Sequence, residues 1–110
     1  MEQTLIVLTN VPDAELAKSL AHTLVERRLA ACVNIMPAVQ SIYRWQGAVE
    51  HASEISLMIK STQARYAELE AAIVAAHPYD VPEIIALPIT AGLLAYLNWI
   101  VAETGKELNV

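Results

Sequence analysis

The feature that most limits the fold of this chain is a long extended stretch centred on a tight turn. Residues 31–45 are rich in β-favouring side chains, Gln46-Gly47 follows as a two-residue turn, and residues 49–61 alternate between apolar and polar positions. The pattern predicts a hairpin whose arms of about 14 residues span roughly 46 Å at 3.3 Å per residue. A compact domain of this length has a diameter of only about 34 Å. The hairpin must therefore bend or reach a neighbouring molecule.

The register of this hairpin raises a conflict between its two strands. A two-residue turn pairs Trp45 with Ala48 and, continued along the strands, Ile35 with Met58. The apolar residues of the two strands would then face opposite sides of the sheet. One extra residue, most naturally a β-bulge at Pro37, would reconcile them. Alternatively, helices bury one face of the sheet and a partner subunit buries the other. Both interpretations favour an oligomer.

The rest of the chain has the patterns of short strands and amphipathic helices. We expect a strand over 4–9, a helix from its N-cap Asp13 to about residue 29, a second helix capped by Thr62, a strand over 84–89 and a helix over 93–104 that Gly105 ends. With the hairpin, the order is β-α-β-β-α-β-α, and its first six elements match the split βαβ, or ferredoxin-like, arrangement of an α+β domain. Right-handed crossovers place the first two helices on one face of the sheet.

The composition indicates a buried surface shared between molecules. A chain of 110 residues predicts a single domain over 1–110. Hydrophobic residues make up 55% of the chain, and the mean hydropathy is +0.39. A domain this small cannot hide such an apolar surplus in one core, because its surface is large relative to its volume. We therefore expect self-association.

The charge pattern argues against several classes of partner. Twelve acidic and seven basic side chains give a net charge of -5, and the only basic pair is Arg27-Arg28, so a nucleic-acid partner is not expected. No apolar run approaches the roughly 18 residues of a membrane span. The N-terminal residues lead directly into a strand pattern without a basic signal-peptide segment. Cys32 has no second cysteine to pair with, which favours a cytoplasmic location.

A stiff polar bend separates the second predicted helix from the strand that follows it. Its sequence is His77-Pro78-Tyr79-Asp80-Val81-Pro82-Glu83. The two prolines fix the backbone and push the residue before each toward extended geometry, so the bend presents its polar groups in set directions. Loops of this kind often carry function. The alternative is a rigid connector with its polar groups in water.

Six short motifs, in order and at consistent spacing, together indicate a family. They are RLAACVNI at 28–35, SIYRWQG at 41–47, EISLMIK at 54–60, HPYDVPE at 77–83, ALPI at 86–89 and YLNW at 96–99. From about Leu5 to Val101 the chain resembles the CutA divalent-cation tolerance family. The resemblance implies a ferredoxin-like subunit in a tight homotrimer similar in build to the PII signalling proteins, a cytoplasmic location and a role in metal-ion tolerance. It implies no established enzymatic activity and no obligatory cofactor.

Copper binding, described for some members of the family, is implied to use cysteine and histidine ligands. Cys32 and His77 match such positions, and their thiol and imidazole suit copper. Thr9 stands where copper-binding members can have Cys, and Ala76 where they can have a second His. These departures weaken the expectation of a high-affinity site. Without a ligand role, Cys32 would be a small buried hydrophobe and His77 a helix C-cap.

Four further residues are candidates for a ligand cleft completed by another subunit. Glu54 and Lys60 share one strand face but lie about 20 Å apart, so they cannot pair directly. Tyr79 and Glu83 offer a phenol and a carboxylate from the bend. The alternative for all four is a solvated surface.

Three aromatic residues are expected to be packing anchors rather than a stacking platform: Tyr43, Trp45 and Trp99. Trp45, next to the predicted turn, is most simply explained as a knob inserted into a partner subunit.

Two functional hypotheses from different classes follow, and an enzyme ranks below both. The first is a non-enzymatic homotrimer that responds to divalent metal ions and binds copper or another divalent cation through His77 and Cys32. The second is a PII-like regulator that holds a small anionic ligand in inter-subunit clefts, an analogy at the level of fold. An enzyme is disfavoured because the sequence has no phosphate loop and no nucleophile motif.

Overall fold

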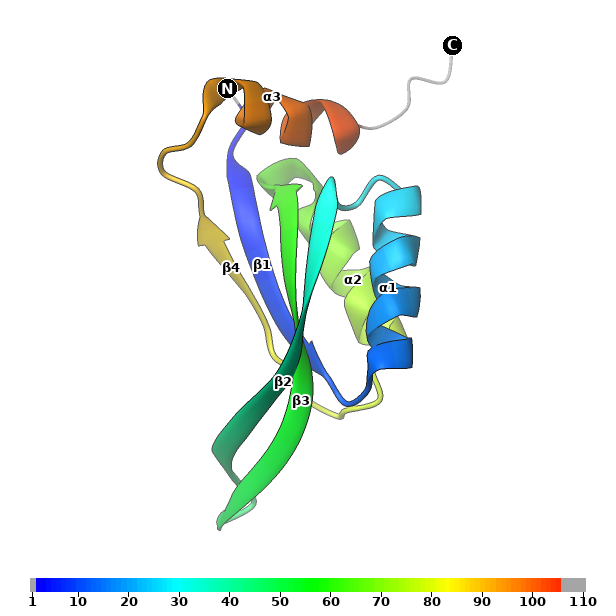
Figure 1. The fold of residues 1–110 in the computed structure, drawn as a ribbon, viewed down its shortest axis with the longest axis vertical. Coiled ribbons are helices and arrows are strands. Elements are labelled where there is room, and N and C mark those ends of the chain that lie inside the picture. Colours follow the sequence, from blue (N-terminus) through cyan, green and yellow to red (C-terminus); the bar gives the residue numbers. More distant parts are fainter. Residues whose placement is uncertain (1, 106–110) are drawn as a thin grey trace.

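The computed structural model describes residues 2–105, which form a four-stranded antiparallel sheet with helices packed against it (Figure 1). In chain order the elements are β1 (Thr4–Val11), α1 (Ala14–Glu26), β2 (Cys32–Trp45), β3 (Ala48–Thr62), the single 3-10 turn η1 (Gln63–Arg65), α2 (Tyr66–Ala76), β4 (Ile84–Pro88) and α3 (Leu94–Glu103). The strand order β2-β3-β1-β4 is that of the ferredoxin-like split βαβ arrangement. The predicted α+β class is confirmed, and the strand predicted over 84–89 is β4, a short strand at the edge of the sheet.

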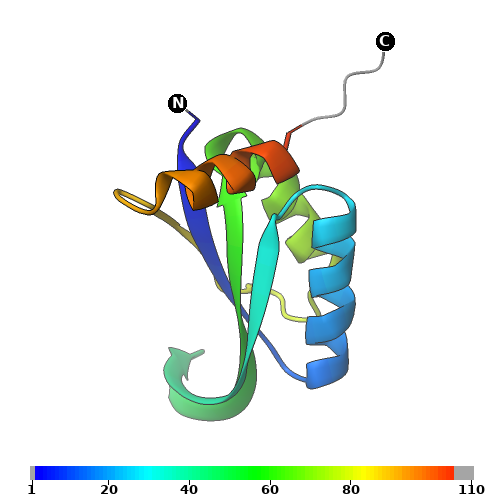
Figure 2. The ribbon, with the colours of Figure 1, turned by 45° about the horizontal axis from the view of Figure 1, so that its top comes forward.

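Two helices cover one face of the sheet, and the third crosses the other face near one end. α1 and α2 lie together on one side, whereas α3 passes in front of β1 and β3 on the opposite side (Figures 1 and 2). Alternate strand residues such as Val7 and Ile59 point toward Leu24 of α1 and Ile73 of α2, and all four are fully buried. Each such aliphatic side chain contributes roughly 1.5–3 kcal/mol to stability relative to exposure.

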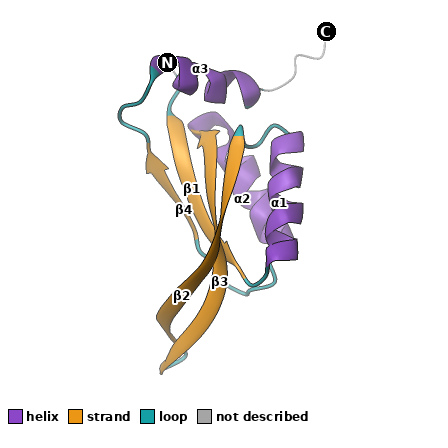
Figure 3. Cartoon of the chain, viewed as in Figure 1, coloured by secondary structure: helices purple, strands orange, loops and turns teal. Residues whose placement is uncertain are grey.

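The hairpin of β2 and β3 gives the molecule its elongated shape. Its distal half extends beyond the helices and curls (Figures 2 and 3), and the molecule measures 50 × 30 × 23 Å. Trp45 pairs with Ala48 across the tip, and the turn residues Gln46 and Gly47 have φ values of 49° and 84°. Positive φ at both positions matches the type I′ turn that joins twisted strands. The hairpin that overshoots the domain and bends is therefore confirmed.

A β-bulge resolves the register conflict in this hairpin. Ile35 pairs with Leu57 rather than with Met58, because β2 carries one more residue than β3 around Pro37. Ala38 lies in the left-handed region, with a φ of 47°. The extra residue turns the apolar residues of β2 to the same face as those of β3, which is the first of the two interpretations of the apolar pattern.

Two predicted helix ends are wrong. The first helix stops at Glu26 rather than near residue 29, because Arg28 takes a left-handed φ of 59° and reverses the chain. Thr62 does not cap the second helix, since it is the buried last residue of β3 and its side chain makes no capping hydrogen bond. The turn η1 intervenes, and α2 begins at Tyr66.

The face of the sheet that lies opposite α1 and α2 retains exposed apolar side chains. On β4, Ile85 is 49% exposed and Leu87 is 47% exposed. Their register partners on β1, Leu8 and Ile6, lie on the same face. Within residues 2–105, no helix has the length and apolar character needed to cross a membrane.

Candidate functional site

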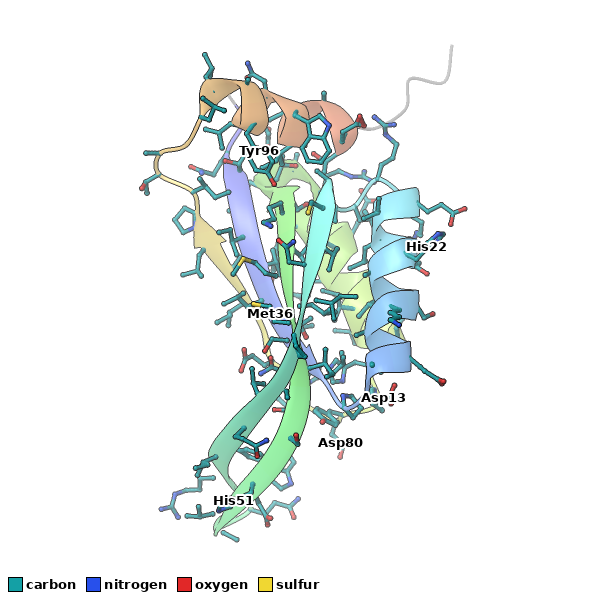
Figure 4. The ribbon with its side chains drawn as sticks, viewed as in Figure 1. Asp13, His22, Met36, His51, Asp80 and Tyr96 are labelled. Carbon is teal, nitrogen blue, oxygen red and sulfur yellow. The ribbon has the colours of Figure 1, made fainter. Side chains whose placement is uncertain are left out.

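A cavity lies between the curled half of the hairpin and the bend after α2. Its volume is about 610 Å³. Figure 4 shows Asp80 on the bend beside the hairpin, with His51 further out near the tip. The lining residues are Asn10, Ser41, Ile42, Tyr43, Trp45, Glu54, Pro78, Tyr79, Asp80, Val81 and Glu83. The residues singled out in the bend therefore meet the hairpin, although about 30 residues of sequence separate them.

His77 fixes the bend to the end of β1. Its backbone N–H caps α2 by donating to the carbonyl of Ile73 at 2.9 Å. The ring Nδ1 accepts the backbone N–H of Tyr79 at 3.2 Å, and Nε2 lies 2.7 Å from the carbonyl oxygen of Asn10. A carbonyl can only accept, so Nε2 carries the proton and donates it. Both ring nitrogens are thus engaged, and the C-cap role weighed for His77 is present.

Glu54 is a buried carboxylate at the floor of the cavity. Its side chain is on β3 and the residue is 7% exposed. The Tyr79 hydroxyl donates a hydrogen bond to Glu54 Oε2 at 3.1 Å. Burial raises the pKa of the Tyr79 phenol, and the hydrogen bond and negative charge of Glu54 raise it further. The Tyr79 ring also packs on His77, with 4.6 Å between ring centroids.

Lys60 and Cys32 lie together at the other end of the sheet, outside this cavity. They are register partners on β3 and β2, and Lys60 Nζ is 4.0 Å from Cys32 Sγ. Lys60 Nζ also donates to the Asn34 side-chain carbonyl. Tyr96 of α3 lies close to Cys32. Burial is the largest cause that raises the pKa of the Tyr96 phenol, and the Cys32 thiol raises it further. Lys60 therefore does not join the other three predicted cleft residues.

The two predicted metal ligands are well separated within one subunit. His77 contacts Asn10, whose register partner is Ser56, whereas Cys32 pairs with Lys60. Four residues along β3 correspond to about 13 Å. In the described part of the chain, no group of three or more His, Cys, Asp or Glu side chains is placed to hold a metal ion. One subunit therefore cannot bind a single ion with both residues.

The predicted aromatic anchors divide between the two ends of the molecule. Tyr43 and Trp45 line the cavity and are 44% and 41% exposed. Trp99 lies on α3 and stacks on Tyr96 with 5.6 Å between ring centroids. Asn10, which also lines the cavity, was not identified from the sequence, and its hydrogen bond with His77 uses a backbone carbonyl that no side-chain pattern reveals.

Comparison with known proteins agrees with this fold. The model of the family "CutA1 divalent ion tolerance protein" matches residues 5–103. The divalent-cation tolerance protein CutA of Thermus thermophilus is 50% identical over 100 residues, covering 91% of this chain and 97% of that protein. The chloroplastic CutA protein of Arabidopsis thaliana is 46% identical over 97 residues, covering 88% of this chain and 53% of that protein.

Solved structures show the same architecture at high similarity. The Thermus thermophilus protein superposes with a TM-score of 0.91 at 49% identity, covering 93% of this chain and 99% of that one. CutA1 from Oryza sativa gives a TM-score of 0.92 at 40% identity, with 96% and 97% of the two chains covered. With the ferredoxin-like sheet, the curled hairpin and the HPYDVPE bend in place, this chain belongs to the CutA1 family of divalent-ion tolerance proteins.

Proposed function

We propose that this chain is a non-enzymatic protein of the divalent-cation response, that it works as a homotrimer, and that it holds its cation at the cavity between hairpin and bend. The observation that carries the proposal is the charge of this cavity. Glu54, Asp80 and Glu83 line it, and none of its lining residues is Lys or Arg. Carboxylate oxygens are ligands for divalent cations, and they attract them over the longer range as well.

Completion by a second subunit fits the incomplete ligand set of one chain. The described residues of a single subunit supply no group of three metal-ligating side chains. Tyr43 and Trp45 leave the cavity walled by partly exposed aromatic rings on the hairpin side. A neighbouring copy packed against these rings would cover apolar surface and bring further ligands to the carboxylates.

Copper binding through His77 and Cys32 remains a prediction, and the contacts of both side chains show what a bound copper ion would have to displace or approach. A metal at His77 would have to replace the hydrogen bond to Asn10 or to the Tyr79 backbone. Cys32 is half-buried beside the Lys60 ammonium, which repels a cation. Copper at Cys32 would therefore require additional ligands from another subunit and would have to approach an ammonium group, whereas no Lys or Arg lines the carboxylate cavity.

A PII-like regulator, the alternative, could use the same cavity, but the cavity does not suit the anionic ligand expected for it. A volume of about 610 Å³ accommodates a small molecule. An anion there would meet three carboxylates, and Lys60, the cation expected to receive it, lies in the other cluster. The charge therefore favours a cationic occupant.

The non-enzymatic role and the cytoplasmic location have separate support. The non-enzymatic role rests on the family, whose name describes tolerance of divalent ions rather than a reaction. The cytoplasmic location rests on Cys32, the single cysteine of the chain.

Calorimetric titration of the purified protein with Cu²⁺ and with Zn²⁺ tests the proposal. We expect Glu54→Gln to weaken binding about tenfold, because one charged ligand is lost, while the amide still accepts the Tyr79 hydrogen bond. Glu83→Gln should act in the same direction. Glu103→Gln, at the C-terminal end of α3, is the charge-matched control and should leave the affinity unchanged. Equal affinities for wild type and both cavity variants would exclude this cavity as the cation site.

A further inference from the structure

A second cavity, separate from the hairpin and the bend, concentrates the positive charge of an acidic chain. It has a volume of about 370 Å³ and lies where the end of α1, the turn η1, the first turn of α2 and Gly105, two residues after α3, come together. Three of the seven basic side chains of the protein line it, although the net charge of the chain is -5. The lining residues are Glu26, Arg27, Arg28, Leu29, Arg65, Glu68 and Gly105.

Arg65 is a buried guanidinium whose three nitrogens each have one hydrogen-bond partner. It is 7% exposed, and its carboxylate partner Glu68 has a side chain that is 49% exposed at 3.1 Å. Its other two hydrogen bonds reach the carbonyls of Arg28 at 3.4 Å and Arg27 at 3.5 Å, which are long for N–H···O bonds. A guanidinium has five N–H donors, so Arg65 retains donor capacity in a place where water has limited access.

Arg28 is held in the cavity wall by an unusual backbone. Its φ of 59° places it in the left-handed region at the position after a helix where glycine is preferred. The side chain reaches α3, with Nε 3.1 Å from the carbonyl of Gly105 and an Nη 2.8 Å from that of Ala102. These bonds fix the guanidinium against the end of α3. The Arg28 side chain is therefore held in the cavity wall by contacts within the protein.

Arg27 supplies the accessible charge at the rim. It is exposed and makes no side-chain hydrogen bond to another described residue. Both carboxylates of the cavity have neighbours of their own, since Glu68 pairs with Arg65 at 3.1 Å and Glu26 lies 3.3 Å from the His22 ring. In addition, α2 begins here without a side-chain N-cap, and Glu68 is the acidic residue of its first turn.

From this arrangement we propose an anion-binding site in the Arg27–Arg28–Arg65 cavity, for a small oxyanion group such as a phosphate or carboxylate. Planar guanidinium groups match both groups by paired hydrogen bonds. The site is independent of the acidic cavity and of the cation proposed there. It gives the protein a second ligand of opposite charge, on the α1–α2 side of the molecule.

Phosphorus-31 NMR and calorimetric titration of the full-length protein with inorganic phosphate test the site. Sodium chloride at equal ionic strength is the control for non-specific charge effects. We expect saturable phosphate binding by the wild type. Titrations with glycerol phosphate and with succinate then distinguish a phosphate ester from a dicarboxylate as the preferred group.

Two exposed variants of opposite sign make the test specific. Arg27→Gln should weaken phosphate binding about tenfold, since one charge-assisted interaction is lost. Glu26→Gln should strengthen it, because a carboxylate leaves the wall. Arg44→Gln, which removes the same charge on the hairpin, should have no effect. The proposal is overturned if phosphate and chloride act alike on the wild type, or if Arg44→Gln weakens binding as much as Arg27→Gln.

Discussion

At the scale of single residues, Thr9 shows how a polar group can be buried at a cost to stability. It is fully buried on the core face of β1, with Leu57 and Ile84 as its register partners. Its Oγ1 is a buried polar atom with no hydrogen-bond partner among the described residues. An unsatisfied buried polar group costs about 1–3 kcal/mol. The sequence placed Thr9 in a buried strand, but only the packing around it shows that its hydroxyl lacks a partner.

We therefore expect Thr9→Val to raise the free energy of unfolding by about 1 kcal/mol, since valine keeps the shape and removes the hydroxyl. Urea denaturation at a fixed protein concentration measures it, because self-association makes apparent stability depend on concentration. Thr104→Val is the matched control. Thr104 is equally buried, but its Oγ1 donates to the Ile100 carbonyl at 2.8 Å. A stabilisation as large for Thr104→Val, or none for Thr9→Val, would contradict the interpretation.

At the scale of elements, the sequence was most informative where two patterns had to agree. The turn and the two apolar faces of the hairpin agree when one extra residue is present, so the bulge beside Pro37 was one of the two interpretations that the sequence allowed. The end of α1 was not predicted correctly, because a left-handed backbone conformation at Arg28 ends the helix and no residue type at that position indicates it. Leu29 N–H donates to the Leu24 carbonyl and Arg28 N–H to the Val25 carbonyl, the pattern of a Schellman motif. The motif usually carries glycine where this chain has Arg28.

The contact between Arg28 and α3 predicts a specific outcome for Arg28→Gly. Glycine relieves the left-handed backbone, which costs roughly 1–2 kcal/mol in other residues, but it removes the hydrogen bonds to Ala102 and Gly105. We expect hydrogen exchange to become faster in α3 while the core strands stay protected. Gln46→Gly is the control, because it relieves a φ of 49° in the hairpin turn far from α3. Unchanged exchange in α3 for Arg28→Gly would show that this tether does not hold the helix.

At the scale of the whole molecule, the parts of the site that the sequence could not place depend on how distant segments meet. Glu54, Tyr79 and Glu83 line one cavity because the hairpin curls back over the bend, and the bulge is part of that curl. Lys60 was grouped with them on the basis of strand face alone. Lys60 lies six residues from Glu54 along β3, and it is therefore beside Cys32 and close to α3 instead. Local patterns predicted the elements well, but only the assembled sheet sorts the polar residues into two clusters.

The exposed apolar face of the sheet, opposite α1 and α2, leads to a prediction about assembly. Burying an apolar side chain of this size is favourable by roughly 1.5–3 kcal/mol, so the proposed homotrimer should depend on the face that carries Ile85, which is 49% exposed. Light scattering coupled to gel filtration should give three times the 12.0 kDa of one chain for the wild type. We expect Ile85→Lys to lower this mass, because a charge is then buried in the interface. Val25→Lys is the matched control, since Val25 is 43% exposed on the outer side of α1. A wild-type mass of one chain at micromolar concentration, or equal dissociation by both substitutions, would show that this face does not bind other copies.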